Sequence, residues 1–225
     1  MKIQFLGHAA FALEHDGKTV LVDPFLTGNP KAAATADEVA ADAIFLTHGH
    51  SDHIGDTVDI AKRTGATVVA IVELAGELSE SGVEDVKDPN IGGTVDLGWV
   101  SVRLTPAWHT STTPKGTVNT PAGLVIEMGG KRIYFAGDTG LFSDLALPAK
   151  RGHLDLAVIP IGGHYTMDRF DAVVAAELIK ADQVIPCHYD TFPPIETDAQ
   201  AFKADVQNAG FAEVIVLDPG ASHEL

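Results

Sequence analysis

The sequence has a single cysteine, Cys187, and therefore forms no internal disulfide bond. It also lacks any run of about 18 apolar residues, the length that a membrane-spanning helix needs. Its first residues, 1–6, alternate like a strand and lack the apolar core of a secretory signal. From these absences we expect a cytoplasmic protein with neither a membrane span nor a disulfide framework.

Basic residues are scarce: 15 lysines and arginines stand against 31 acidic residues, for a formal net charge of −16. Nucleic-acid affinity rests largely on lysine and arginine side chains that neutralise phosphates, so this charge disfavours nucleic acid as a partner. No composition shift or short-period repeat divides the chain, and 225 residues, 45% of them hydrophobic, suit one α/β domain over residues 1–225. We expect a small-molecule substrate, and leave open whether the chain forms a homo-oligomer.

Three histidines and an aspartate lie within residues 48–53, directly after the apolar run 43–46. A short continuous apolar run indicates a buried strand. Because strand side chains alternate between faces, the ligand-type residues must lie in the loop beyond it, where they can converge. Imidazole nitrogen and carboxylate oxygen suit zinc, iron or manganese. The pattern therefore predicts a metal site formed by His48, His50, Asp52 and His53.

This motif resembles the signature of the metallo-β-lactamase superfamily, whose members are mostly hydrolases with one or two metal ions. The superfamily pattern continues with a lone histidine, an aspartate after a strand, and a histidine near the C-terminus. The chain offers His109, Asp138 and His188 in that order. The resemblance spans residues 3 to about 195 and implies a four-layer αββα sandwich, with two sheets face to face and helices outside.

Three more stretches, at 7–11, 161–167 and 188–194, narrow the resemblance. They read Gly-His-Ala-Ala-Phe, Ile-Gly-Gly-His-Tyr-Thr-Met and His-Tyr-Asp-Thr-Phe-Pro-Pro. They are similar to a bacterial and archaeal subgroup of metal-dependent hydrolases, related to the L-ascorbate-6-phosphate lactonase branch. The resemblance leaves the substrate open.

The resemblance also implies two sets of metal ligands joined by Asp138. The first ion would be held by His48, His50 and His109. The second would be held by Asp52, His53 and His188. Two divalent ions (zinc, manganese or nickel) would share a hydroxide that attacks an acyl or phosphoryl centre, and Asp52 would help to orient it. The expected substrate is a small anionic ester, either a lactone or a phosphodiester.

Three alternatives stay open. A single-iron sulfur dioxygenase would use only His48, His109 and Asp138. A nuclease of the same superfamily would act on a polyanion instead of a small ester. A non-catalytic metal-binding protein would saturate its metal and leave no position for substrate. An oxygen-reducing di-iron site is disfavoured, because the flavodiiron branch carries glutamate where this chain has His50.

Two histidines outside the ligand set follow predicted strands at the same edge of the fold. His8 comes after residues 2–6, and His164 comes after 155–160 and a pair of glycines. Both are candidates for a catalytic general acid or a substrate ligand. His15, His153 and His223 are interpreted as structural.

Other side chains near these motifs allow weaker interpretations. Asp190 and Thr191 are either partners that orient an imidazole or part of a turn before two prolines. We interpret Trp108 and Cys187 as core residues. The candidates for an anion clamp are Lys115, Arg132 and Arg169.

Periodicity and turn residues predict the secondary structure. Strands are expected at 2–6, 10–15, 19–23, 43–46, 67–71, 83–87, 93–97, 100–105, 123–128, 131–136, 155–160, 183–186 and 213–217. Helices are expected at 52–64, 73–81, 168–180 and 197–208, with Asp168 as an N-cap. The segment 110–121, rich in threonine, proline and glycine, is expected to be a mobile loop beside the site.

Two complete ligand sets predict about two divalent ions per chain after loading with zinc, manganese or nickel, as measured by elemental analysis. His188→Ala should lower the content towards one ion, because it removes a ligand of the second set only. A ceiling of one ion that His188→Ala leaves unchanged would contradict a dinuclear site.

Overall fold

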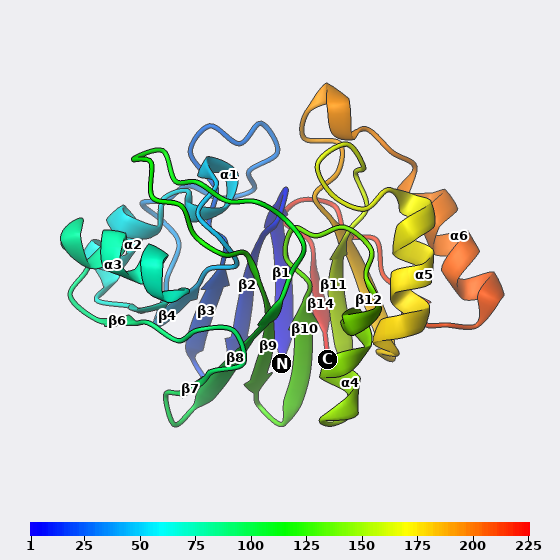
Figure 1. Cartoon of the computed structure of the whole chain (residues 1–225), viewed down its shortest axis with the longest axis horizontal. Coiled ribbons are helices and arrows are strands. Elements are labelled where there is room, and N and C mark those ends of the chain that lie inside the picture. Colours follow the sequence, from blue (N-terminus) through cyan, green and yellow to red (C-terminus); the bar gives the residue numbers. More distant parts are fainter.

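A computed structural model describes residues 1–225 and contains two seven-stranded sheets packed face to face (Figure 1). The first sheet contains, in spatial order, β14 (Ser222–Glu224), β1 (Lys2–Gly7), β2 (Ala10–His15), β3 (Lys18–Val22), β4 (Ala43–Phe45), β5 (Thr67–Val69) and β6 (Val86–Lys87). The second contains β13 (Glu213–Val214), β12 (Gln183–Cys187), β11 (Leu156–Pro160), β10 (Lys131–Phe135), β9 (Ala122–Met128), β8 (Val100–Pro106) and β7 (Thr94–Asp96).

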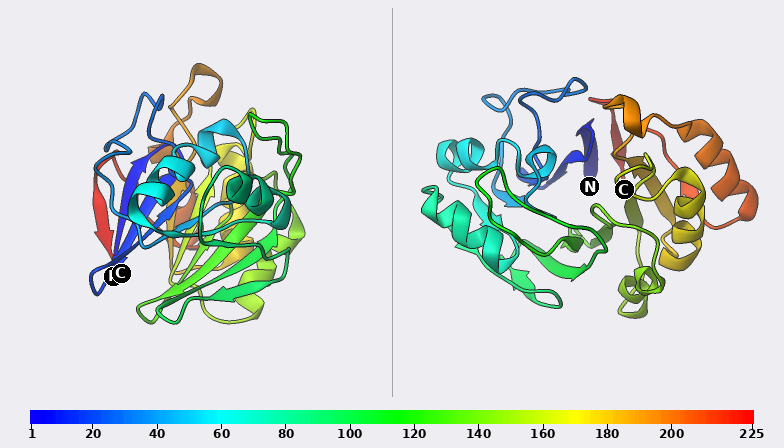
Figure 2. Two further views of the ribbon diagram at one scale, coloured as in Figure 1. Left: turned by 90° about the vertical axis from the view of Figure 1, so that its left-hand side faces the viewer. Right: turned by 45° about the horizontal axis from the view of Figure 1, so that its top comes forward.

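Helices cover the outer side of each sheet (Figure 2). Beside the first sheet lie α2 (Thr57–Thr64) and α3 (Val72–Glu80). Beside the second lie α5 (Arg169–Ile179), α6 (Ala199–Ala209) and the short α4 (Leu147–Lys150). The four-layer αββα sandwich expected from the sequence is confirmed. None of the helices is both long and apolar enough to cross a membrane.

The larger apolar core lies between the sheets, and a second core lies between the second sheet and helices α5 and α6. Helix α5 buries Ala172, Ala175, Ala176 and Ile179. Their spacing places them on one face of the helix, which explains why that face packs against β11. The helix begins at Asp168, whose carboxylate accepts hydrogen bonds from the backbone of the first turn, as predicted.

The direction of the strands gathers the ends of several of them at one edge of the molecule. In the first sheet β1, β3 and β4 run the same way, and in the second β8, β10, β11 and β12 do. The register keeps the strand ends level, for example Pro160 of β11 beside Cys187 of β12. The chain termini lie together at the opposite edge, where the Met1 amino group donates to the Leu225 carbonyl oxygen (3.2 Å) (Figure 1).

The helix predicted over 52–64 is interrupted, which corrects the sequence interpretation. It forms α1 (Ser51–Ile54) and α2, separated by Gly55 with a φ of 40°. A side chain at Gly55 would put a Cβ atom 2.6 Å from the Cα of Phe25. The glycine therefore lets the loop after β3 pack directly against the helix.

The remaining differences concern short elements. The strand predicted over 213–217 is limited to β13, and the last strand of the chain is β14, which pairs with β1 and was not predicted. The predicted strand at 83–87 is limited to β6. The helical segment 143–150 was also missed. These elements have two to four residues each, too few for an apolar period to appear.

Two predictions about side chains near β8 need correction. Trp108 is 71% exposed and stacks on Phe142 (6.0 Å between ring centroids), so its assignment to the core was wrong. The segment 110–121, predicted to be a mobile loop, is anchored instead. Gly49 N–H donates to Ser111 Oγ (3.0 Å) and Asn119 Oδ1 (3.1 Å), and both of these residues are buried. Cys187, by contrast, is buried in the core as predicted.

Phe202 of α6 is fully buried in the second core, so we expect it to contribute strongly to the stability of the fold. Phe202→Ala should lower the free energy of unfolding by about 3–5 kcal/mol, because it removes apolar contacts and leaves a cavity. Urea unfolding followed by circular dichroism measures this. Phe170→Ala is the matched control: Phe170 is 62% exposed, and its loss should change the value by about 0.5 kcal/mol or less.

Candidate metal centre

The seven predicted ligands meet at the edge where these strands end. The loop 47–50 and helix α1 follow β4, so they bring four of the ligands from the first sheet. The loops after β8, β10 and β12 bring His109, Asp138 and His188 from the second. The centre therefore lies between the two sheets, and Asp52 and His188, which are 136 positions apart in the sequence, become neighbours.

Three residues that directly follow strands at this edge have left-handed backbone conformations. These are His8 (φ 62°), Asp23 (φ 45°) and His188 (φ 55°). Such conformations are strained for residues other than glycine and cluster at functional sites. Here each one turns the chain at the end of its strand. All three side chains are buried and lie close to the predicted ligands.

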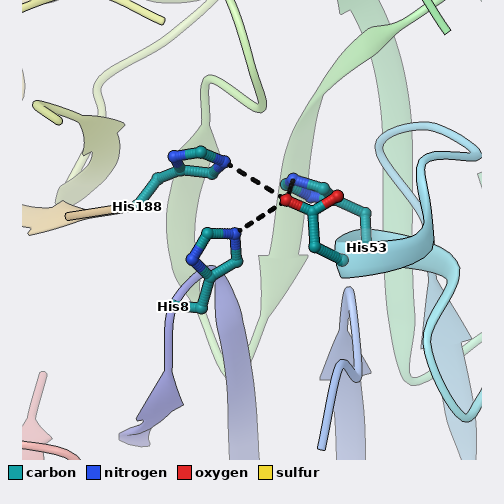
Figure 3. Close-up of side chains that lie close together, drawn as sticks. His8, His53 and His188 are labelled. Carbon is teal, nitrogen blue, oxygen red and sulfur yellow. Dashed lines mark hydrogen bonds and ion pairs between the residues drawn. The ribbon is translucent and has the colours of Figure 1, made fainter. Parts of the chain in front are cut away.

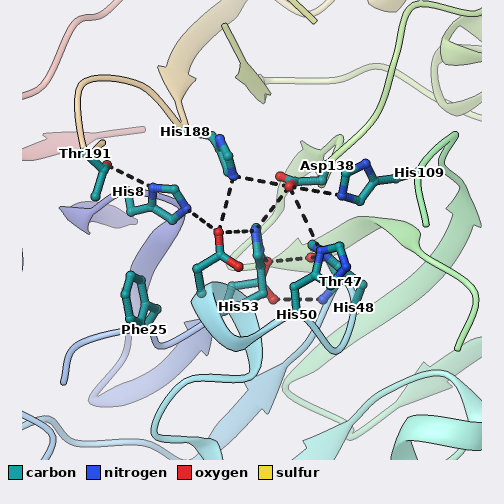
Figure 4. A network of polar contacts seen from close by, with 12 residues as sticks. His8, Phe25, Thr47, His48, His50, His53, His109, Asp138, His188 and Thr191 are labelled. Carbon is teal, nitrogen blue, oxygen red and sulfur yellow. Dashed lines mark hydrogen bonds and ion pairs between the residues drawn. The ribbon is translucent and has the colours of Figure 1, made fainter. Parts of the chain in front are cut away.

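Asp138 lies at the middle of the cluster and is almost fully buried. Its Oδ2 atom is surrounded by imidazole nitrogens from both predicted sets (Figure 4). The Nε2 atoms lie at 3.2 Å (His188), 3.4 Å (His53), 3.5 Å (His109) and 3.9 Å (His48). Asp138 therefore lies within 3.9 Å of donor atoms from both predicted sets.

The other donors fall into two groups on either side of Asp138. The first contains His48, His50 and His109, with His48 Nε2 and His50 Nδ1 3.1 Å apart. The second contains Asp52, His53 and His188, together with His8 (Figure 3). Within each group the donor atoms lie within 4.8 Å of one another. These groups contain the residues of the two sets that the sequence resemblance implied, while Asp23, His48 and His53 form a third, overlapping cluster. The assignment of the two sets to two ions stays a prediction.

The donor atoms fit a divalent ion in each group. Ligand atoms on one tetrahedral zinc ion lie about 3.3 Å apart, close to the spacings seen here. The Nε2 atoms of His53 and His188 are buried without a hydrogen-bond partner. Buried polar atoms without a partner are costly and need an explanation. A metal ion bound to each nitrogen would supply the missing partner.

Asp23 fixes two of the ligands and was not singled out from the sequence. Its Oδ2 atom accepts from His53 Nδ1 (2.8 Å) and from the Thr47 hydroxyl (2.5 Å). The Thr47 oxygen in turn lies 3.0 Å from His48 Nδ1. Both rings are then protonated on Nδ1, which leaves their Nε2 lone pairs directed at the centre. The only sequence signal was an aspartate at the end of the strand predicted over 19–23.

His8 holds the Asp52 carboxylate in a similar way. His8 Nε2 lies 3.0 Å from Asp52 Oδ2, and because a carboxylate only accepts, the ring nitrogen is the donor (Figure 3). His8 Nδ1 lies 2.9 Å from the Thr191 hydroxyl, which donates to it. His8 thus lies beside the candidate metal ligands, and Thr191 is the partner that orients its imidazole. The role of general acid or substrate ligand proposed for His8 from the sequence stays a prediction.

The pKa values show how the cluster balances its charges without metal ions. Burial favours neutral His188, but the negative charge of Asp138 outweighs it and raises the pKa of His188 to about 9. The pKa of His53 is raised for the same reasons. Burial lowers the pKa of His8 to about 4, so this ring is neutral at pH 7. A metal ion in the second group must therefore displace protons from His53 and His188.

An open cleft of about 490 Å³ reaches the metal centre. Among its lining residues are His50 and His109 of the first group, Asp52 and His188 of the second, and Asp138. Both groups are therefore accessible to a small molecule. The rest of the lining consists of Phe25, Ser51, Thr110, Tyr165 and Phe192.

Four candidates from the sequence lie outside this cleft. His164 is exposed and packs edge-on against the ring of Tyr165, which lines the cleft instead. The three residues proposed as an anion clamp are bonded elsewhere: Lys115 to Ser81, Arg132 to Glu127, and Arg169 to Asp205. None of them lines the cleft, so the clamp interpretation was wrong.

Comparison with known proteins agrees with the fold and with a metal-dependent hydrolase. Residues 2–188 match the family model of the β-lactamase superfamily domain, so the chain is a member of that superfamily. Metal-dependent hydrolases of Methanopyrus kandleri and Carboxydothermus hydrogenoformans are 47% and 48% identical to it. The first alignment covers 100% of both chains, and the second covers 98% of each. Within the superfamily, the chain belongs to the UPF0173 family of metal-dependent hydrolases.

Solved structures show the same fold. Igni18, described as a novel metallo hydrolase from Ignicoccus hospitalis, superposes with a TM-score of 0.90 at 38% identity, over 100% of this chain and 98% of that one. An isothiocyanate hydrolase from Delia radicum gut bacteria has a TM-score of 0.77 at 17% identity, over 100% and 99% of the chains. The second likeness shows the fold alone. The resemblance to the superfamily is therefore confirmed, while the link to the ascorbate-phosphate lactonase branch stays a prediction.

The contacts of Asp23 predict that Asp23→Asn weakens metal binding by about 10–100-fold, because His53 and His48 lose the partner that fixes their proton positions. Competition with a chromophoric chelator measures the affinity. Asp155→Asn is the control, since Asp155 also accepts a backbone hydrogen bond but binds Arg132 and Lys131 on another part of the molecule. Equal affinities in all three proteins would contradict the role of Asp23.

Proposed function

We propose that this protein is a dinuclear metal-dependent hydrolase that cleaves a small ester, either a lactone or a phosphodiester. The observation that carries the proposal is the position of Asp138, buried between two donor groups that both face one open cleft. Zinc, manganese and nickel all suit these nitrogen and oxygen donors.

Two ions held by these groups would acidify a shared water molecule and polarise the substrate oxygen. The open cleft supports catalysis over mere metal storage, because donors of both groups remain reachable by a small molecule. The second group favours two ions over a single-iron site, since it has its own complete set of donors and two nitrogens without another partner.

Asp52 and His8 act together in this proposal. Asp52 would bind an ion and help to orient the attacking water, as expected from the sequence. Its Oδ2 atom is held by His8, whose ring is buried and uses both nitrogens in hydrogen bonds. We therefore assign His8 to positioning Asp52 rather than to direct contact with substrate.

The charge of the substrate follows from the lining of the cleft. No lysine or arginine contributes to it, so only the ions and the imidazoles would meet a negative group. We therefore expect the negative charge of the ester only at the group that is cleaved, because the ions would lie there. A polyanion such as RNA is disfavoured, because the chain carries a net charge of −16 and the cleft offers no cationic side chain to hold a backbone.

The proposal predicts that metal-loaded protein hydrolyses members of a panel of lactones, phosphodiesters and thioesters. The appearance of the hydrolysis product measures the activity. Asp138→Ala serves as the blank, because it removes the carboxylate between the two donor groups. Cleavage of structured RNA with no turnover of any small ester would overturn the proposal.

The same assay tests His8. His8→Ala should retain its metal content and lose about 10–100-fold in turnover, because Asp52 is no longer held in place. His153→Ala is the histidine control, since His153 lies at the surface and pairs with Asp182. Turnover of His8→Ala equal to that of the control would return His8 to a structural role.

A further inference from the structure

The cleft over the metal centre has an aromatic wall made of Phe25, Tyr165 and Phe192. The three residues come from separate loops, which follow β3, β11 and β12. Besides the metal donors, the polar groups of the cleft are the uncharged hydroxyls of Ser51, Thr110 and Tyr165. The wall therefore offers apolar surface and no positive charge to a bound molecule.

Two of the aromatic rings stand beside the second donor group. The ring of His8 packs edge-on against Phe25 (5.8 Å between centroids; Figure 4). It also packs edge-on against Phe192 (5.6 Å). Because His8 also holds Asp52, the two phenyl rings flank that side of the centre. A substrate with its ester group at Asp138 would extend its remaining part toward these rings.

Phe25 is held rigidly in this position. The Asp56 carboxylate accepts from the backbone N–H groups of Leu26 (2.9 Å) and Thr27 (2.8 Å). Asp56 N–H in turn donates to Pro24 O (3.0 Å). The loop that carries Phe25 is thus tied to the start of α2 on both sides, so the ring is in place before substrate binds.

The other two aromatic residues are held by the loops of the second sheet. Phe192 precedes a short proline-containing helix, where the fully buried Ile195 donates its N–H to Phe192 O (3.0 Å). The loop that carries Tyr165 packs on the same helix through Gly162, where an added Cβ would lie 2.9 Å from Ile195 Cβ. The buried Ile195 side chain therefore fixes both loops relative to each other.

We propose that the part of the substrate that is not cleaved is uncharged and apolar, such as a phenyl ring or a short alkyl chain, and packs against Phe25, Tyr165 and Phe192. The proposal rests on the proposed hydrolase function and names its substrate class. A second carboxylate or phosphate would lose its water beside aromatic rings and find no cation. This disfavours a phosphorylated sugar lactone.

Phosphonates test the proposal by binding alone, without turnover. Zinc-loaded protein is titrated calorimetrically with methylphosphonate, phenylphosphonate and 4-phosphonobenzoate, which share the metal-binding group and differ only in the remaining part. Phenylphosphonate should bind about tenfold or more tightly than methylphosphonate, because its ring buries apolar surface. The added carboxylate of 4-phosphonobenzoate should remove most of that gain.

Two arginine variants distinguish the effect of a cation inside the cleft from the effect of added positive charge elsewhere on the protein. Tyr165→Arg places a cation in the cleft and should make 4-phosphonobenzoate bind more tightly than phenylphosphonate. Phe170→Arg is the matched control: Phe170 is an aromatic residue nearby in sequence with similar exposure (62% against 54% for Tyr165), but it lies outside the cleft. In this variant phenylphosphonate should still bind more tightly than 4-phosphonobenzoate.

Equal or tighter binding of 4-phosphonobenzoate by the unmodified protein, or no binding of any phosphonate, would overturn the inference. The hydrolysis assay with the ester panel then shows whether the apolar site or the hydrolase function has failed. Phosphonate preference without hydrolysis of any ester would contradict the hydrolase and leave the apolar site standing. Hydrolysis without preference for apolar substituents would contradict the apolar site alone.

Discussion

A buried carboxylate with no lysine or arginine beside it is the constraint on which this centre depends. Asp138 is almost fully removed from water, and its charge must be balanced by what surrounds it. The protein surrounds it with four imidazoles. Without metal, the raised pKa values of His53 and His188 let these two rings hold the balancing protons, and a bound metal ion would displace those protons. Asp23 and His8 then matter because they fix the geometry in which this exchange takes place.

Much of the ligand set was predictable because its members are either adjacent in sequence or follow recognisable strands. The apolar run 43–46 and the histidines after it reveal both the strand and the loop. Asp23 and Thr191 were harder, since each acts on an imidazole brought to it from another part of the fold. An aspartate after a strand is common in turns. Nothing local distinguishes one that accepts from His53.

The errors in the fold have similar physical causes. Gly55 breaks a helix whose apolar pattern continues through it, because a distant loop at Phe25 needs the space. The strand β14 exists only because β1 offers it an edge to pair with. Trp108 was assigned to the core from its type, yet it lies exposed against Phe142. The spacing of apolar residues in the sequence reveals which face of a helix or strand is buried. Contacts with distant parts of the chain decide where that helix or strand ends.

Each donor group takes ligands from both sheets: His48 and His50 with His109, and Asp52 and His53 with His188. An ion in either group would fasten the two halves of the sandwich together. Folding and metal supply then become thermodynamically linked, because the unfolded chain cannot assemble these donors. Free metal at a hundred times its dissociation constant would add about 2.7 kcal/mol per site to the stability. The concentration of available metal would thus help to determine how long each molecule survives in the cell.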